Sequence, residues 1–231
     1  MKSVIQKVPI PTAGVALGLA ALGILLQPLS EAFHLIAGVL SLIMVAFLAA
    51  KIILFPAMVR EDLKNPVFAA VSATLFMTTM QLATYLAPLA YDAAFVIWSI
   101  AVIGHFCLMA WFTIAFTLHF DLKQVFPTHF IAYVGIIVAS LTSPAFGMEA
   151  VGAVIFWFGF ALYLALLVIV GLRYIKHEVP EPSKPLFCIY AAPMSLSLAG
   201  YLASAAEPNA VMVGIMAVLA QLFQKIKSFS L

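Results

Sequence analysis

The stretch from 149 to 173, EAVGAVIFWFGFALYLALLVIVGLR, decides the fold class of this protein. Between Glu149 and Arg173 it contains no charged residue, and most of its side chains are large and apolar. At about 1.5 Å per residue, a helix of this length spans the roughly 30 Å hydrocarbon core of a bilayer. The run lacks the alternation of apolar and polar residues that a strand of a membrane barrel requires. The stretch therefore predicts a transmembrane helix.

Segments of the same kind recur along the 231-residue chain, with short polar or proline-bearing breaks between them. Apolar residues make up 65% of the sequence and charged residues only 9%, far too few for the surface of a soluble domain. The first segment is expected to be retained, because no A-x-A site for signal cleavage closes it. We therefore predict an all-α polytopic membrane protein with about eight transmembrane helices, at 11–27, 32–56, 66–87, 91–119, 125–142, 149–173, 186–204 and 208–224.

The distribution of charge indicates the orientation. If the N-terminus is cytoplasmic, the connections after the second, fourth, sixth and eighth helices also face the cytoplasm. All eleven basic residues then lie at or near that side, as the positive-inside rule requires, with Lys51 snorkelling to it from the second helix. We expect a multi-pass protein of the inner (plasma) membrane with both termini cytoplasmic. The basic residues are Lys2, Lys7, Lys51, Arg60, Lys64, Lys123, Arg173, Lys176, Lys184, Lys225 and Lys227.

A two-helix unit repeats along the chain in this orientation. Each unit is a helical hairpin that starts at the cytoplasmic face, and the hairpins cover about 11–56, 66–119, 125–173 and 186–224. Transport proteins are often built from internal repeats of this kind. Nothing in the composition interrupts the repeat, so residues 1–231 are expected to form a single transmembrane domain. The longest inner connection, 176–185, carries three prolines and is predicted to be an extended loop.

The odd-numbered and even-numbered helices differ in polarity. The odd ones begin or break at proline and carry small polar residues, whereas the second and sixth are more apolar. Polar groups in hydrocarbon need partners, so we expect an inner ring of odd helices and an outer ring of even ones. The alternative is that serine, threonine and glycine only allow close helix packing. If the inner ring encloses a pore, its expected lining is Gly14, Thr74, Thr78, Gly135, Ser140, Pro193 and Ser197.

Charged side chains are absent from the middle of every predicted segment. This argues against a proton relay or a ring of charged ligands inside the membrane. It is compatible with a pore whose selectivity comes from weak dipoles. In the expected orientation all odd helices point their N-termini at the cytoplasm, and the positive dipole ends there favour anions.

Three short stretches resemble one family of membrane proteins. They are KVPIPTAGVALGLAALG at 7–23, EDLKNPV at 61–67 before the third helix, and LFCIYAAPMS at 186–195 in the seventh. In order and position they are similar to the tellurite-resistance/dicarboxylate transporter (TDT) family. This is the voltage-dependent anion channel family, which includes the plant guard-cell slow anion channels. Some bacterial relatives have been labelled exfoliative toxin-like, a label that their hydropathy does not support.

The resemblance implies five helical hairpins around a central pore, lined by proline-kinked odd helices, and assembly into a homotrimer. It also implies a channel or carrier for small anions, such as inorganic anions or dicarboxylates, or a role in tellurite-related export. The family has ten helices, whereas this chain is expected to be short at its C-terminus and to supply eight. The gating phenylalanine of the family lies in the ninth helix, so no residue here inherits that role. An inactive, truncated family member is therefore one alternative.

The histidines raise another alternative, a membrane-bound haem or metal enzyme with redox or hydrolytic activity. Their spacing matches no ligand or protease motif, which favours packing or interfacial roles. We therefore predict a transport protein and not an enzyme, with the bilayer and small anions as partners and no nucleic acid. No catalytic, cofactor-binding or metal-binding residue is assigned. The histidines are His34, His105, His119, His129 and His177.

Overall fold

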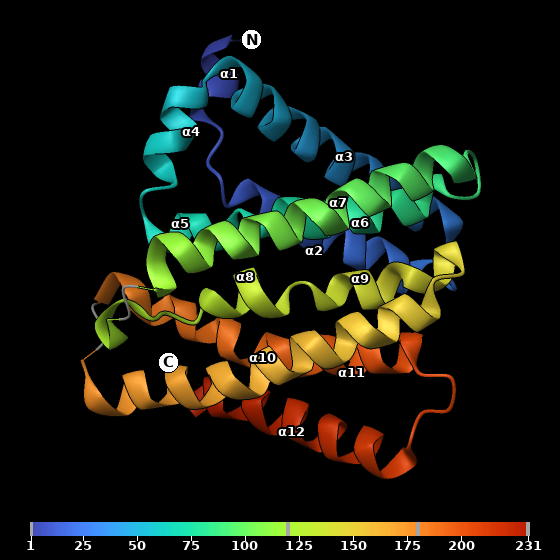
Figure 1. Ribbon diagram of the computed structural model, residues 1–231. Coiled ribbons are helices and arrows are strands. Elements are labelled where there is room, and N and C mark those ends of the chain that lie inside the picture. Colours follow the sequence, from blue (N-terminus) through green and yellow to red (C-terminus); the bar gives the residue numbers. More distant parts are fainter. Residues whose placement is uncertain (1, 119–120, 179–180, 230–231) are drawn as a thin grey trace. The chain divides into compact units, whose positions relative to one another are not determined.

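The computed structural model describes residues 2–118, 121–178 and 181–229. Every regular element within these residues is helical, which confirms the predicted all-α class. The chain consists of two compact units, Met1–Phe112 and Thr113–Leu231 (Figure 1). The first unit contains the first predicted hairpin and most of the second, and the second unit contains the last two.

The eight predicted segments coincide with apolar helices in the part of the chain that the structure describes. Five are long and apolar enough to cross a membrane: Glu31–Leu54, Pro66–Leu86, Tyr91–Thr117, His129–Phe146 and Glu149–Lys176. Shorter apolar helices occupy the remaining positions: Thr12–Leu26, Cys188–Ser204 and Ala210–Lys225. The protein is therefore a multi-pass membrane protein.

The first unit is built from the hairpins α2–α3 and α6–α7, which pack against one another through α2 and α6. Two further short helices, α1 and α4, were not predicted from the sequence. Helix α4 starts with Pro56, which suits a first turn because proline has no N–H to satisfy there. The helices are α1 (Lys2–Lys7), α2 (Thr12–Leu26), α3 (Glu31–Leu54), α4 (Pro56–Asp62), α5 (Pro66–Val71), α6 (Ala73–Leu86) and α7 (Tyr91–Phe112).

The second unit repeats this plan with the hairpins α9–α10 and α11–α12, which pack through α9 and α11. Gly147 ends η3 in the left-handed conformation, with φ of 62°, where glycine is favoured. The elements are the π-helix η1 (Thr113–Thr117), the 3₁₀ helices η2 (Leu122–Gln124), η3 (Ser143–Phe146) and η4 (Glu181–Ala191), and α8 (His129–Val134), α9 (Ile137–Thr142), α10 (Glu149–Lys176), α11 (Ala192–Ser204) and α12 (Ala210–Phe229).

The prediction of an extended loop at 176–185 is wrong for residues 181–185. Residues from Glu181 onward belong to η4, and 179–180 lie outside the described residues. Prolines exclude the regular α-helix by lacking an N–H donor, but a tighter 3₁₀ turn tolerates them at its start. The seventh transmembrane segment is therefore a 3₁₀ helix that continues into α11.

Proline accounts for only part of the irregularity of the odd helices. Pro66 begins α5 and Pro193 lies in the first turn of α11, as predicted. The third segment is interrupted at Ser72, however, and the fifth at Gly135. The Ser72 hydroxyl donates to the Ala69 carbonyl oxygen at 2.7 Å, a local bond of the kind that competes with the helical pattern.

Burial separates the odd from the even helices. In its most apolar stretch, the third segment is 50% buried and the fifth 78%, against 28% for the second and 33% each for the fourth and sixth. In each unit the buried central helix is therefore an odd one. The exposed side chains of the even helices are large and apolar, as contact with lipid requires.

Candidate functional site

Three residues predicted to line a pore lie on α2 and α6 in the first unit. Thr78 is fully buried, and its hydroxyl oxygen lies 2.7 Å from the Thr74 carbonyl oxygen and 3.1 Å from that of Ala13. One hydroxyl proton serves both acceptors, so Thr78 links α6 to α2. Thr74 is buried and donates to the Val71 carbonyl oxygen at 2.7 Å. Gly14 is half-buried, and a Cβ atom there would meet nothing within 4 Å.

Replacing Thr78 by valine tests whether its hydroxyl holds α2 and α6 together. We expect the free energy of unfolding to fall by about 0.6 kcal/mol, the usual contribution of a hydrogen bond between transmembrane helices. Thr79→Val is the control, since the Thr79 hydroxyl donates only to Leu75 within α6, at 2.8 Å. Unfolding by SDS in mixed micelles measures both variants. Equal losses in the two would contradict a link between helices.

Ser140 joins α9 to α11 in the second unit. Its buried hydroxyl oxygen lies 2.9 Å from the Ser204 hydroxyl oxygen and 3.1 Å from the Gly200 carbonyl oxygen. Ser204 donates its own proton to the same Gly200 carbonyl at 2.8 Å, so Ser140 is the donor to Ser204. The hydroxyl proton of Ser140 is therefore already donated to groups of the protein itself.

Ser197 is the exception among the predicted lining residues. It is 0% exposed, and its hydroxyl oxygen has no hydrogen-bond partner among the described residues. Pro193 lies one turn earlier on α11 and is also buried. A buried hydroxyl without a partner is uncommon, and a water or a passing ligand is a usual explanation. Gly135 is buried where α8 ends, and its N–H donates to the Phe130 carbonyl oxygen at 3.2 Å.

Two basic side chains are buried at corresponding places, in the last turns of α3 and α10. Lys51 is only 4% exposed, so the protein and not water surrounds its side chain, and its predicted reach to the membrane interface stays a prediction. Its ammonium group donates to the Val8 carbonyl oxygen at 2.7 Å and lies 3.3 Å from a carboxylate oxygen of Asp62. Arg173 is 3% exposed, and Nη1 donates to the carbonyl oxygens of His177 and Glu178 at 2.9 and 3.1 Å. Both charged groups therefore donate to carbonyl oxygens that lie just beyond the end of a helix.

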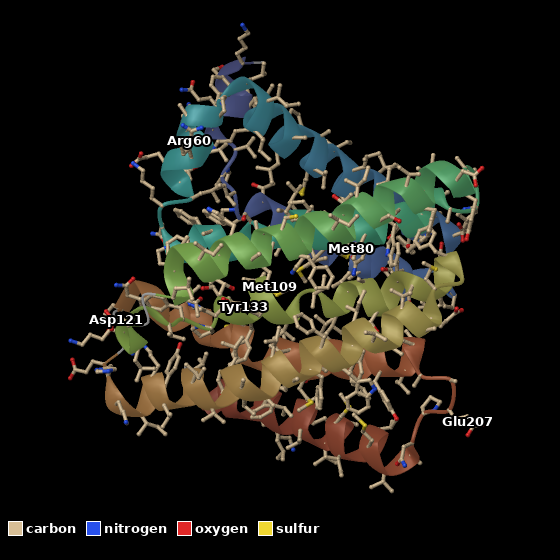
Figure 2. The ribbon with its side chains drawn as sticks, viewed as in Figure 1. Arg60, Met80, Met109, Asp121, Tyr133 and Glu207 are labelled. Atoms are coloured by element: carbon tan, nitrogen blue, oxygen red, sulfur yellow. The ribbon has the colours of Figure 1, made fainter. Side chains whose placement is uncertain are left out.

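A cluster of three hydroxyls near the start of the second unit is not predicted from the sequence. The Tyr133 hydroxyl oxygen on α8 lies 2.8 Å from that of Thr113 and 2.7 Å from that of Thr117 (Figure 2 labels Tyr133). The two threonines are the ends of the π-helix η1. Wide π turns often accompany functional sites, but composition and hydropathy give no signal for them.

His34 and His129 lie in packing environments. His34 Nδ1 lies 3.1 Å from the Gly23 carbonyl oxygen, and its ring stacks on Tyr85 with centroids 4.0 Å apart. His129 Nδ1 lies 3.1 Å from the Phe126 carbonyl oxygen. No group of three or more His, Cys, Asp or Glu side chains that could hold a metal ion occurs among the described residues. His119 lies outside those residues.

Each unit also has an apolar groove. The groove in the first unit, about 340 Å³, lies between α3, α6 and α7 and includes Leu42, Leu82 and Ile97. The groove in the second unit, about 710 Å³, lies between α10, α11 and α12 and includes Leu164 and Met216. No charged side chain lines either groove, and most of the lining is apolar, which makes both unsuitable for a small anion.

Comparison with known proteins gives a match along almost the whole chain. A family model described as voltage-dependent anion channel matches residues 7–227. No curated protein matches the sequence. The family match covers both units and every residue predicted to line a pore.

Proposed function

Because the chain belongs to the voltage-dependent anion channel family, we propose that it lets small anions cross the bilayer. The match over residues 7–227 is the observation that carries this proposal. Inorganic anions are the first class of solute that we propose. Dicarboxylates and tellurite-related oxyanions, the substrates that the sequence resemblance implies, are the second.

The chemistry of the odd helices supports anion passage. Most of their polar side chains are neutral hydroxyls, and the buried basic groups Lys51 and Arg173 are already bound to carbonyl or carboxylate oxygens. Hydroxyl donors bind an anion weakly enough to release it, which conduction requires. A free buried ammonium or guanidinium group would instead hold the anion strongly.

Ser197→Ala should lower anion flux without loss of stability. The Ser197 hydroxyl is buried and unpaired, so its removal leaves no partner exposed and is neutral or stabilising for the fold. If the hydroxyl donates to a passing anion, losing a bond of about 1.5 kcal/mol lowers flux by about tenfold. Ser140→Ala is the matched control: its hydroxyl is already bonded, so stability falls while flux per folded protein changes less. Unchanged flux in the Ser197 variant would contradict a lining role.

Anion flux in proteoliposomes tests the proposed function. Vesicles loaded with a halide-quenched dye are mixed with iodide, and the rate of quenching is compared with that of protein-free vesicles. The proposal requires a faster rate with protein, and equal rates would contradict it. Competition by malate or tellurite then tests the second class of solute.

Cysteine accessibility tests the lining itself. The native Cys107 and Cys188 are free and are first replaced by alanine. Gly14 has open space beside it, so Gly14→Cys should react with a water-soluble, membrane-impermeant thiol reagent. Ile100 on α7 is 64% exposed and apolar, and Ile100→Cys should be protected by lipid. Equal protection of both cysteines would contradict a water-filled path beside Gly14.

We also propose the inner membrane as the location, with both termini cytoplasmic, and assembly into a homotrimer. The positive-inside distribution supports the orientation, and the family resemblance supports the trimer. A reporter fused to each terminus, active only in the cytoplasm, tests the orientation. Mass measurement of the detergent-solubilised protein tests the trimer, and a monomer or dimer would contradict it.

A further inference from the structure

The short helices α1 and α4 form a shelf at one end of the first unit, made of residues 2–7 and 56–62. Helix α1 packs against α3, and α4 follows α3 after the single residue Phe55. The two short helices touch directly, since the Gln6 side-chain amide lies 3.5 Å from the Met58 sulfur. Figure 1 shows both helices beside the end of α3.

The side chain of Lys51 on α3 binds both short helices of this shelf at their ends. Its ammonium group binds the Val8 carbonyl oxygen just after α1 at 2.7 Å and the Asp62 carboxylate at the end of α4 at 3.3 Å. Lys51 is 4% exposed, so water competes little for these bonds. The shelf is therefore held in place by a buried charge and not only by its own weak helical preference.

The length of α3 places the shelf at the membrane surface. The helix has 24 residues. At 1.5 Å per residue this is about 36 Å, slightly more than the hydrocarbon core of about 30 Å. A segment that follows directly after its end lies among the lipid headgroups.

Three basic side chains of the shelf are exposed and carry no ion pair among the residues that the structure describes: Lys2, Lys7 and Arg60 (Figure 2 labels Arg60). The acidic groups nearby are already neutralised. Asp62 pairs with Lys51, and Glu61 pairs with Lys64 at 2.6 Å. The surface therefore keeps an excess of positive charge beside the bilayer.

Apolar side chains accompany these charges. Val4 is 58% exposed on α1, Met58 38% on α4, and Ile53 76% in the last turn of α3. Exposed apolar groups beside basic ones are typical of segments that lie in the headgroup region. Soluble anions would gain nothing from the apolar part of this surface, whereas a phospholipid satisfies both parts.

We propose that the shelf binds the headgroups of anionic phospholipids, with Lys2, Lys7 and Arg60 facing the phosphate groups. This role is separate from anion passage, because it concerns the lipid around the protein and not the solute that crosses. Each basic side chain near an anionic surface favours association by about fivefold, so three give an upper bound near a hundredfold.

Quenching of tryptophan by brominated lipids tests the proposal at the shelf itself. Ile53→Trp places a reporter beside the shelf, and Phe33→Trp places one at the opposite end of α3, where the exposed fraction is 61%. Vesicles of phosphatidylcholine contain brominated phosphatidylglycerol or brominated phosphatidylcholine. Quenching of the native Trp98, Trp111 and Trp157 in the unchanged protein is subtracted as background.

We expect the reporter of the Ile53→Trp variant to prefer brominated phosphatidylglycerol at least fivefold over brominated phosphatidylcholine, and the reporter of the Phe33→Trp variant to show no such preference. Adding K2Q, K7Q and R60Q together to the Ile53→Trp variant should remove the preference, whereas E61Q and K64Q together, which remove an ion pair and leave the net charge unchanged, should keep it. Equal preference at the two ends, or a preference that survives the triple change, would overturn the proposal. Loss of the preference in glycerol phosphate, but not in chloride of equal ionic strength, would assign the shelf to soluble phosphates and also overturn it.

Discussion

Gly23→Ala is expected to lower the free energy of unfolding by about 2 kcal/mol, because a methyl group does not fit where α2, α3 and α6 meet. The Tyr85 hydroxyl donates to the Ala20 carbonyl oxygen at 2.6 Å, directly beside Gly23, and a Cβ atom would collide with it. The same atom would lie 2.9 Å from the Ala37 side chain and 3.0 Å from the His34 carbonyl oxygen. Neither the short alanine nor the backbone can turn away, so the helices must separate.

Gly18→Ala on the same helix is the matched control. A Cβ atom at Gly18 would meet nothing within 4 Å. The change should be neutral or stabilising, because alanine has a higher helix propensity than glycine by up to about 1 kcal/mol. Unfolding in mixed micelles, followed by tryptophan fluorescence, measures both variants. A similar effect at the two positions would show that helix propensity, and not packing around Tyr85, governs α2.

Arg173→Leu should lower the free energy of unfolding of the second unit by about 3 kcal/mol. The guanidinium is 3% exposed and donates to the carbonyl oxygens of His177 and Glu178, which close the end of α10. It also lies 5.7 Å from the centre of the Phe126 ring, within range of a cation–π contact. Leucine keeps some of the apolar contact but leaves two carbonyl groups without their donor.

Lys176→Leu separates the loss of charge from the loss of the buried bonds. Lys176 lies one turn further along α10 and is exposed. Its replacement by leucine removes one positive charge, as Arg173→Leu does, but breaks almost no contact within the protein. We expect less than about 0.5 kcal/mol for this control. The outcome that would contradict the account is an equal loss for the two variants. That result would mean that net charge at this end, and not the carbonyl contacts of Arg173, stabilises the unit.

Hydropathy and charge were enough to predict the helices, because bilayer thickness imposes both their length and their composition. The segment 149–173, for example, lies within α10 and differs from it by only three residues at its C-terminal end. The helices α1 and α4 were not predictable in the same way, since their few residues carry no long apolar run. They depend on tertiary contacts with α3 and on Lys51.

The candidate site was less predictable, because a hydroxyl in a membrane helix has several uses. Polarity alone predicts a lining role for Thr78 and Ser140, yet both side chains hydrogen-bond neighbouring helices. Ser197 has the same residue type as Ser140, yet its hydroxyl has no partner among the described residues. Which of these situations holds depends on the facing helix, and spacing along one chain does not reveal it. The lining role of all three stays a prediction.

The reversal potential in a planar bilayer is the most direct test of anion conduction. The purified protein is reconstituted, and current is recorded with different concentrations of potassium chloride on the two sides. We expect a current that reverses close to the chloride equilibrium potential, and a smaller current for Ser197→Ala. A reversal at the potassium equilibrium potential, or no current above that of the protein-free bilayer, would contradict it.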